Sequence, residues 1–166
     1  MTPVLYILMR TDLDSMNPGK AMAQASHAGS AFVHNADPGY NIDEELYNAW
    51  KESTTQGFGT VLVIEVNEAQ LINAVEVAES CGVDAFPSGI VHDPTYPLQD
   101  GDTTHFIPVD TCGYIFGDKD NPVLQSIIGN FELHYSRRNN AISTNSYRIR
   151  IKRGKKLRHL QSCAQS

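Results

Sequence analysis

The chain has 166 residues, of which 41% are apolar, enough for one globular domain with an ordinary core. No apolar run is long enough to span a membrane, and the first one follows no basic segment and ends at Arg10 and Asp12, so we expect a cytoplasmic protein. The three cysteines form no C-x-x-C pair, which argues for reduced thiols and against a zinc site. We expect Cys81 and Cys112 to pack in the core, and we assign no role to Cys163.

The net charge of −6 is unevenly distributed along the chain. Residues 1–135 contain all nineteen acidic residues and four basic ones, a net charge of −15, whereas residues 136–166 contain nine basic residues and no acidic one. Such a boundary is typical of a folded domain followed by a basic tail. We therefore predict a domain over 1–135 and a tail over 136–166, with an added strand or hairpin as one form of the tail.

The first predicted elements are a strand and a helix joined by a polar turn. Residues 4–9 are apolar, β-branched or aromatic, which indicates a buried strand, and Asn17 and Pro18 are typical of a helix start. At 100° per residue, one narrow stripe of this helix contains Lys20, Gln24, His27 and His34, and the opposite, apolar side contains Met22, Ala25, Gly29, Phe32 and Val33. The stripe starts where the helix dipole favours anions, although an ordinary solvated face would show the same pattern.

The rest of the domain alternates between strand and helix signals. The pattern predicts helices over 43–51, Glu68–Ser80 and 121–130, strands over Thr60–Val66, 85–91 and 105–116, and an acidic, proline-broken loop over 94–103. This order favours an α/β fold, a three-layer sandwich with a mixed four-stranded sheet, helices on both faces and several parallel strand pairs.

Charged side chains stand where the predicted strands end. Arg10 and Asp12 follow the first strand and Asp93 follows the third, close in sequence or topology to the helix that carries Lys20. In open α/β sheets, binding sites collect beyond the carboxyl ends of the strands, although an Asp at a strand end is often only a turn former.

The tail has its own pattern. Residues 147–152 alternate apolar and basic side chains, as a strand with one cationic face does, and a basic cluster follows. Such a segment binds phosphate backbones, solubilises a chain end or folds onto an acidic body. The residues predicted to contact RNA are Arg148, Arg150, Lys152, Arg153, Lys155 and Lys156.

Several motifs together resemble those of the type II peptidyl-tRNA hydrolases, which are typical of archaea and eukaryotes. These are Arg10-Thr-Asp-Leu13, Met16-x-x-Gly19-Lys20, Ala23-Gln24-x-Ser26-His27-Ala28 and Ile90-x-x-Asp93, with further matches in 104–117 and 128–133. The resemblance covers residues 4–135. It departs from the family pattern at 94–103, where this chain carries an insertion.

The resemblance implies hydrolysis of the ester between a peptide and the terminal ribose of tRNA, which releases stalled peptides during translation and recycles the tRNA. It implies no metal or cofactor, and it suggests a homodimer. The catalytic residues that it implies are Lys20, Gln24, His27, Asp93 and Thr104, and the substrate-binding residues are Arg10, Asp12, Ser26 and His105.

The roles follow from what ester hydrolysis needs, namely an activated water, an oxyanion stabiliser and a proton for the leaving oxygen. Lys20 suits the oxyanion or the terminal phosphate, Gln24 orients the carbonyl or the water, and Thr104 positions a neighbour. Either His27 or Asp93 serves as the base. In the alternative reading, Lys20 and Asp93 form only a structural ion pair, and the chain is a non-catalytic module that binds RNA or protein.

Overall fold

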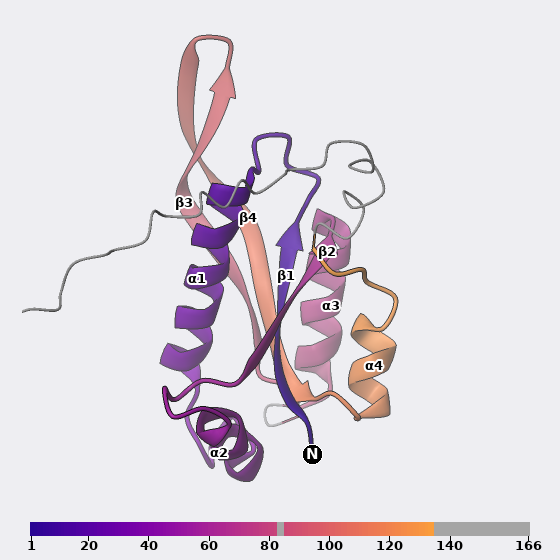
Figure 1. Ribbon diagram of the computed structural model, residues 1–166. Helices are drawn as coiled ribbons and strands as arrows, with labels where there is room; N and C mark the ends of the chain where they lie inside the picture. Colours follow the sequence, from indigo (N-terminus) through magenta and orange to yellow (C-terminus); the bar gives the residue numbers. More distant parts are fainter. Residues whose placement is uncertain (83–84, 135–166) are drawn as a thin grey trace, which may run out of the picture. The chain divides into compact units, whose positions relative to one another are not determined.

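The computed structural model describes residues 1–82 and 85–134 (Figure 1). The predicted tail, its six RNA-contacting residues, Cys163 and the domain boundary at 135 lie outside the described residues. The elements are β1 (Pro3–Arg10), α1 (Pro18–Asn35), α2 (Glu44–Glu52), β2 (Thr60–Val66), α3 (Glu68–Ser80), β3 (Ser88–Asp100), β4 (Thr103–Asp118) and α4 (Pro122–Ile128). None of the helices in the described ranges is long and apolar enough to cross a membrane.

The four strands form one mixed sheet in the order β2-β1-β4-β3. Only β1 and β2 run parallel, and β4 is antiparallel to both of its neighbours. The expectation of several parallel pairs is therefore wrong, because β3 and β4 form a hairpin instead of being joined by a crossover helix.

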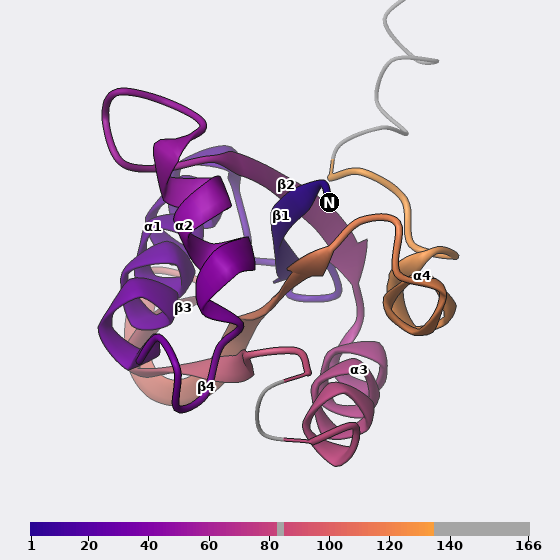
Figure 2. The same cartoon turned by 90° about the horizontal axis from the view of Figure 1, so that it is seen from below.

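The predicted three-layer arrangement is confirmed, with helices covering both faces of the sheet (Figure 2). Successive side chains of a strand point to opposite faces, and β1 is buried on both. Leu5, Ile7 and Met9 pack in a cluster with residues of α1 and α2, while Tyr6 and Leu8 pack in a cluster with residues of α3 and α4.

The acidic segment 94–103 is a β-hairpin, and the prediction of a loop there is wrong. β3 continues to Asp100, β4 begins at Thr103, and the two-residue turn between them starts with Gly101 at φ 56°, a conformation that glycine adopts without strain. In Figure 1 this hairpin extends past the N-terminal end of α1. Its prolines are compatible with a strand because β3 lies at the edge of the sheet.

Helix α1 begins as predicted, since the side chain of Asn17 accepts a hydrogen bond from the N–H of Lys20 at 3.0 Å. Its buried side is only in part the predicted one, since Phe32 is buried as expected. Met22 and Val33 are 70% and 52% exposed, whereas the buried residues of the helix are Ala21, Gln24, Ala28 and Phe32. The helix is rotated so that small residues approach the sheet and Phe32 joins an aromatic cluster that includes Trp50, Tyr114 and Phe116.

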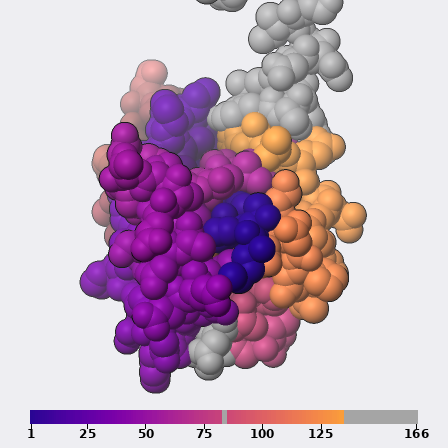
Figure 3. Space-filling view, turned by 60° about the horizontal axis from the view of Figure 1, so that its bottom comes forward, coloured from indigo at the N-terminus to yellow at the C-terminus, as the bar shows by residue number. Residues whose placement is uncertain are grey.

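The N-terminal residues are fixed against the end of β4. The N–H of Thr2 donates to Asp118 Oδ1 at 2.8 Å, and the N–H of Lys119 donates to the carbonyl of Thr2 at 2.9 Å. Hydrogen bonds from the N–H groups of Thr2 and Asp120 lower the pKa of the Asp118 carboxyl. Figure 3 shows these indigo residues at the surface between the magenta and orange parts of the chain.

Candidate active site

The amide of Gln24 joins two strands of the sheet to α1. Its Nε2 donates to Asp93 Oδ2 at 2.8 Å, and its Oε1 accepts from the hydroxyl of Thr111 at 2.6 Å. Gln24 is 5% exposed and Thr111 is fully buried, whereas Asp93 is half-buried. Because both ends of the amide are engaged, its orientation is fixed, and the carboxylate is held at the border between core and solvent.

Two irregularities of the β3–β4 ladder bring these side chains together. Val91 pairs with Cys112 and His92 with Asp110, so that Thr111 is an extra residue on β4. A bulge of this kind re-aims the side chain of the extra residue, here toward α1. The sequence offers no signal for it, and Thr111 is a site residue that sequence analysis missed.

The second irregularity lies between Asp93 and Tyr96. Within it, the N–H of Thr95 donates to Asp93 Oδ1 at 3.0 Å, as in a turn capped by an Asp side chain. Oδ1 also lies 3.5 Å from the Thr95 hydroxyl, whereas Oδ2 accepts from Gln24 alone among the described residues and keeps a lone pair for another partner.

Lys20, one turn before Gln24, reaches the hairpin. Its Nζ donates to the carbonyl of Pro97 at 2.7 Å and lies 4.8 Å from the centroid of the Tyr96 ring. No acidic residue in the described ranges forms an ion pair with this amine within 4.0 Å, so the structure does not contain a Lys20–Asp93 ion pair. Among the described residues, one of the three donors of the ammonium group has an acceptor, and no direct partner neutralises its charge.

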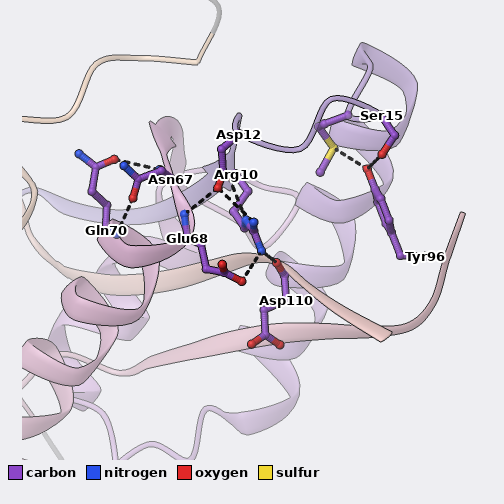
Figure 4. A network of polar contacts seen from close by, with 9 residues as sticks. Arg10, Asp12, Ser15, Asn67, Glu68, Gln70, Tyr96 and Asp110 are labelled. Atoms are coloured by element: carbon purple, nitrogen blue, oxygen red, sulfur yellow. Dashed lines mark hydrogen bonds and ion pairs between the residues drawn. The ribbon is translucent and has the colours of Figure 1, made fainter. Parts of the chain in front are cut away.

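Arg10 lies at the end of β1, and its guanidinium is enclosed by acceptors (Figure 4). It donates to both oxygens of Asp12 at 3.0 and 3.1 Å, to Glu68 Oε1 at 2.9 Å and to the carbonyl of Asp110 at 2.9 Å. The side chain is 7% exposed. These contacts tie β1 to the start of α3 and to β4, and the observed partners leave the guanidinium little capacity for a substrate.

The same contacts set the pKa values of this pair. Burial alone opposes the charged form of both groups, but their mutual hydrogen bonds and attraction outweigh it, so the pKa of Arg10 is raised. The pKa of Asp12 is lowered, with a further contribution from the N–H of Glu68. Both groups therefore stay charged in the folded protein near neutral pH.

Four other predicted site residues lie in the solvent. Ser26 and His27 are exposed on α1, and the ring of His27 has no hydrogen-bond partner in the described part of the chain. Thr104 and His105 are exposed on the hairpin, where the Thr104 hydroxyl donates to Gln99 Oε1 at 2.8 Å. Asp93 pairs with Val109, five residues along β4 from Thr104, which separates Thr104 from Asp93 by about 17 Å.

Of the two cysteines that were expected in the core, one is buried and the other is exposed. Cys112 is buried as expected, and its thiol donates to the backbone carbonyl of Gln24 at 3.3 Å. Burial raises the pKa of Cys112 to about 12, so it stays protonated. Cys81 is exposed just after α3, and its prediction as a core residue is wrong because the helix ends there at the surface.

No group of three His, Cys, Asp or Glu side chains within residues 1–82 and 85–134 is placed to hold a metal ion. The arrangement instead offers a half-buried carboxylate, an amide with fixed orientation and an unneutralised ammonium group on neighbouring elements. Those are the groups that acyl transfer to water requires.

Comparison with curated proteins finds no match. The family model for peptidyl-tRNA hydrolase PTH2 matches residues 3–133, which include β1, the whole of α1, the hairpin and α4. The match covers most of the chain and every residue of the site described above, and the chain therefore belongs to the peptidyl-tRNA hydrolase PTH2 family.

Proposed function

We propose that this protein hydrolyses the ester bond between a peptide and the terminal ribose of tRNA, thereby releasing the peptide and recycling the tRNA. Membership of the family supports the reaction class. The observation that carries the assignment of the site is the position of Gln24, which lies one helical turn after Lys20 and whose amide fixes the carboxylate of Asp93. We call Lys20, Gln24, Asp93 and Thr111 the Gln24 cluster.

Asp93 is the proposed base. The amide of Gln24 and the N–H of Thr95 fix its carboxylate, and the free lone pair on Oδ2 can take the proton of a water molecule. As that water attacks the carbonyl carbon, its proton moves to Asp93; the ester C–O bond then breaks, and the ribose oxygen takes that proton from Asp93, which returns to its carboxylate form. His27, the other candidate, has an exposed ring that nothing in the described residues orients, and orientation is a large part of base catalysis.

Lys20 is the proposed stabiliser of the negative charge that develops on the carbonyl oxygen. An ammonium group without an ion-pair partner keeps its full charge for such an oxyanion. Gln24 acts through Asp93 and Thr111, and Thr111 acts through Gln24, so these two are positioning residues.

The proposed tRNA contacts come from the sequence. Residues 1–135 have a net charge of −15, which repels a phosphate backbone, and residues 136–166 have a charge of +9. We expect removal of 136–166 to weaken tRNA binding and to flatten its dependence on salt concentration. An unchanged salt dependence would assign the basic segment to another role.

The test is a release assay with N-acetylated aminoacyl-tRNA and three variants of the full chain. We expect Asp93→Asn and Lys20→Met each to lower kcat at least about hundredfold, while the exposed His27→Gln stays within about threefold of the parent. Circular dichroism melting checks that the variants are folded. If His27→Gln loses activity and Asp93→Asn keeps it, the base is His27.

The alternative function, a binding module without activity, gives a different result. In that case the parent protein binds N-acetylated aminoacyl-tRNA but releases no amino acid, and the three substitutions change affinity only.

A further inference from the structure

We propose that Tyr96 is a positioning residue that holds the ammonium group of Lys20 in place for the reaction. The inference rests on the proposed function for the role of Lys20 and adds to it a part for the inserted hairpin. Tyr96 belongs to β3, within the segment 94–103 that the type II motifs do not account for.

The contacts of Lys20 with the hairpin come from two adjacent residues. The ring of Tyr96 lies 4.8 Å from Lys20 Nζ, and the carbonyl of Pro97 accepts from the same amine at 2.7 Å. The face of an aromatic ring attracts a cation, and the carbonyl fixes the direction of one N–H. Together they restrict a side chain that otherwise has four rotatable bonds.

The Tyr96 ring is itself fixed by burial and by contacts of its hydroxyl with Ser15 and Met16. Tyr96 is fully buried, its hydroxyl accepts a hydrogen bond from Ser15 Oγ at 3.1 Å, and Met16 Sδ lies 3.9 Å away. Figure 4 shows the Tyr96 hydroxyl directed at the segment that contains Ser15. A buried tyrosine on a projecting hairpin has a fixed ring plane, so it provides a rigid support for the cation.

This arrangement orients Lys20 without neutralising it. An acidic partner would hold the amine equally well but would compete with a developing oxyanion for its charge. A ring face and a carbonyl carry no net charge, so the ammonium group keeps its attraction for an anion. The bulge between Asp93 and Tyr96 places the base and this support on one strand, three residues apart.

A second lysine provides an internal control. Lys51 Nζ lies 5.3 Å from the ring of Tyr47 on α2, a cation–π pair that shares no residue with the Gln24 cluster. The variant Tyr47→Leu therefore measures how the loss of a cation–π contact affects stability in general. It leaves the surroundings of Lys20 unchanged, so it does not show an effect on activity that is specific to Lys20.

The experiment combines kinetics with a spectroscopic measurement that does not depend on turnover. Tyr96→Phe keeps the ring and removes the hydroxyl, whereas Tyr96→Leu removes the ring. We expect Tyr96→Leu to lower kcat about tenfold with a smaller change in KM, and Tyr96→Phe to stay within about threefold of the parent. In NMR spectra, the Lys20 side-chain methylene signals lose their ring-current shift in Tyr96→Leu and keep it in Tyr96→Phe.

The decisive comparison uses the Lys20→Met background. If Tyr96 acts through Lys20, adding Tyr96→Leu to Lys20→Met produces no further loss of kcat. An equal tenfold loss in both backgrounds would overturn the proposal, because Tyr96 would then support the fold alone. If Lys20→Met itself retains activity, the proposed function of Lys20 fails, and the NMR shift still reports whether Tyr96 holds the side chain.

Discussion

Two polar clusters lie at the same end of the sheet, and they differ in how many of their hydrogen-bonding groups are already used. In the Arg10 cluster, which consists of Arg10, Asp12, Glu68 and Asp110, the guanidinium donates four hydrogen bonds to protein acceptors. In the Gln24 cluster, the polar groups of Gln24 and Thr111 are likewise engaged. Lys20, however, keeps unused N–H donors and Asp93 keeps a free lone pair, and both side chains lie at the border with solvent.

This difference suits the Arg10 cluster to a structural role and the Gln24 cluster to the proposed chemical one. A buried cation with four of its five N–H donors engaged stabilises the junction of three elements and has little left to offer a ligand. A carboxylate and an ammonium group that are oriented but not saturated can still bind a water and an oxyanion. The sequence motifs contain residues of both clusters. Only the hydrogen-bond partners of each side chain in the folded protein distinguish the two clusters.

The largest expected effect is that of Gln24→Leu. Leucine has a similar volume but leaves Asp93 Oδ2 without its donor and the Thr111 hydroxyl with only the Val91 carbonyl at 3.4 Å, so the proposed base loses its fixed orientation. We expect kcat in the release assay to fall about hundredfold. Met22→Leu, at an exposed site of the same helix, is the control and stays at parental activity.

The next effect is on stability and comes from Arg10→Met. Removing the guanidinium leaves Asp12 and Glu68 without their cation, and since their side chains are 36% and 58% exposed, water compensates in part. We expect the free energy of unfolding in urea to fall by about 2 kcal/mol, with kcat of the folded protein within about threefold of the parent. A hundredfold loss of kcat at full folding would place Arg10 in the active site.

A smaller effect is expected for Thr111→Val, which keeps the shape and removes the hydroxyl. The Oε1 of Gln24 is then buried without a donor, and the amide is free to turn over. We expect kcat to fall about tenfold, while Thr111→Ser, which keeps the hydroxyl, retains most of the activity. Equal activity of the valine and serine variants would mean that this hydrogen bond does not orient Gln24.

The smallest effect is a pH dependence in the Arg10 cluster. The pKa of Asp12 is lower in the folded protein than its usual value, so its charged form stabilises the fold above about pH 4, and this contribution disappears as the pH falls through the folded-state pKa. We expect Asp12→Asn to cost less than about 1 kcal/mol at pH 6. Once the pH lies below the folded-state pKa of Asp12, the unfolding free energies of parent and variant converge; a difference that persists there would have another cause.

Regular elements were predictable where the local sequence decides them. β2 and α3 occupy the predicted residues Thr60–Val66 and Glu68–Ser80, because a β-branched run and a capped amphipathic segment need no distant partner to be recognised. Asn17 fixes the start of α1 for the same reason. The hairpin was missed because Pro94 and Pro97 indicate a loop unless the strand is known to lie at an edge.

The site was predictable in its residue types but not in its connections. Lys20, Gln24 and Asp93 were named from the motifs, and the structure brings Gln24 to Asp93 and Lys20 to the hairpin. Thr111 and Tyr96 were missed because their orientation depends on two irregularities in strand pairing, which arise only when β3 and β4 align.

The sequence by itself determined the helices and the strands outside the 94–103 hairpin, the start of α1, the family and the charged residues that gather at one end of the sheet. Tertiary structure alone decided that α1 turns Gln24 inward, that Arg10 has acidic partners while Lys20 has none among the described residues, and that Lys20 contacts the β3–β4 hairpin. The physical reason is that propensity and capping act over a few residues, whereas the use of each donor and acceptor depends on groups far apart in the chain, such as Arg10 and Asp110, which are 100 positions apart.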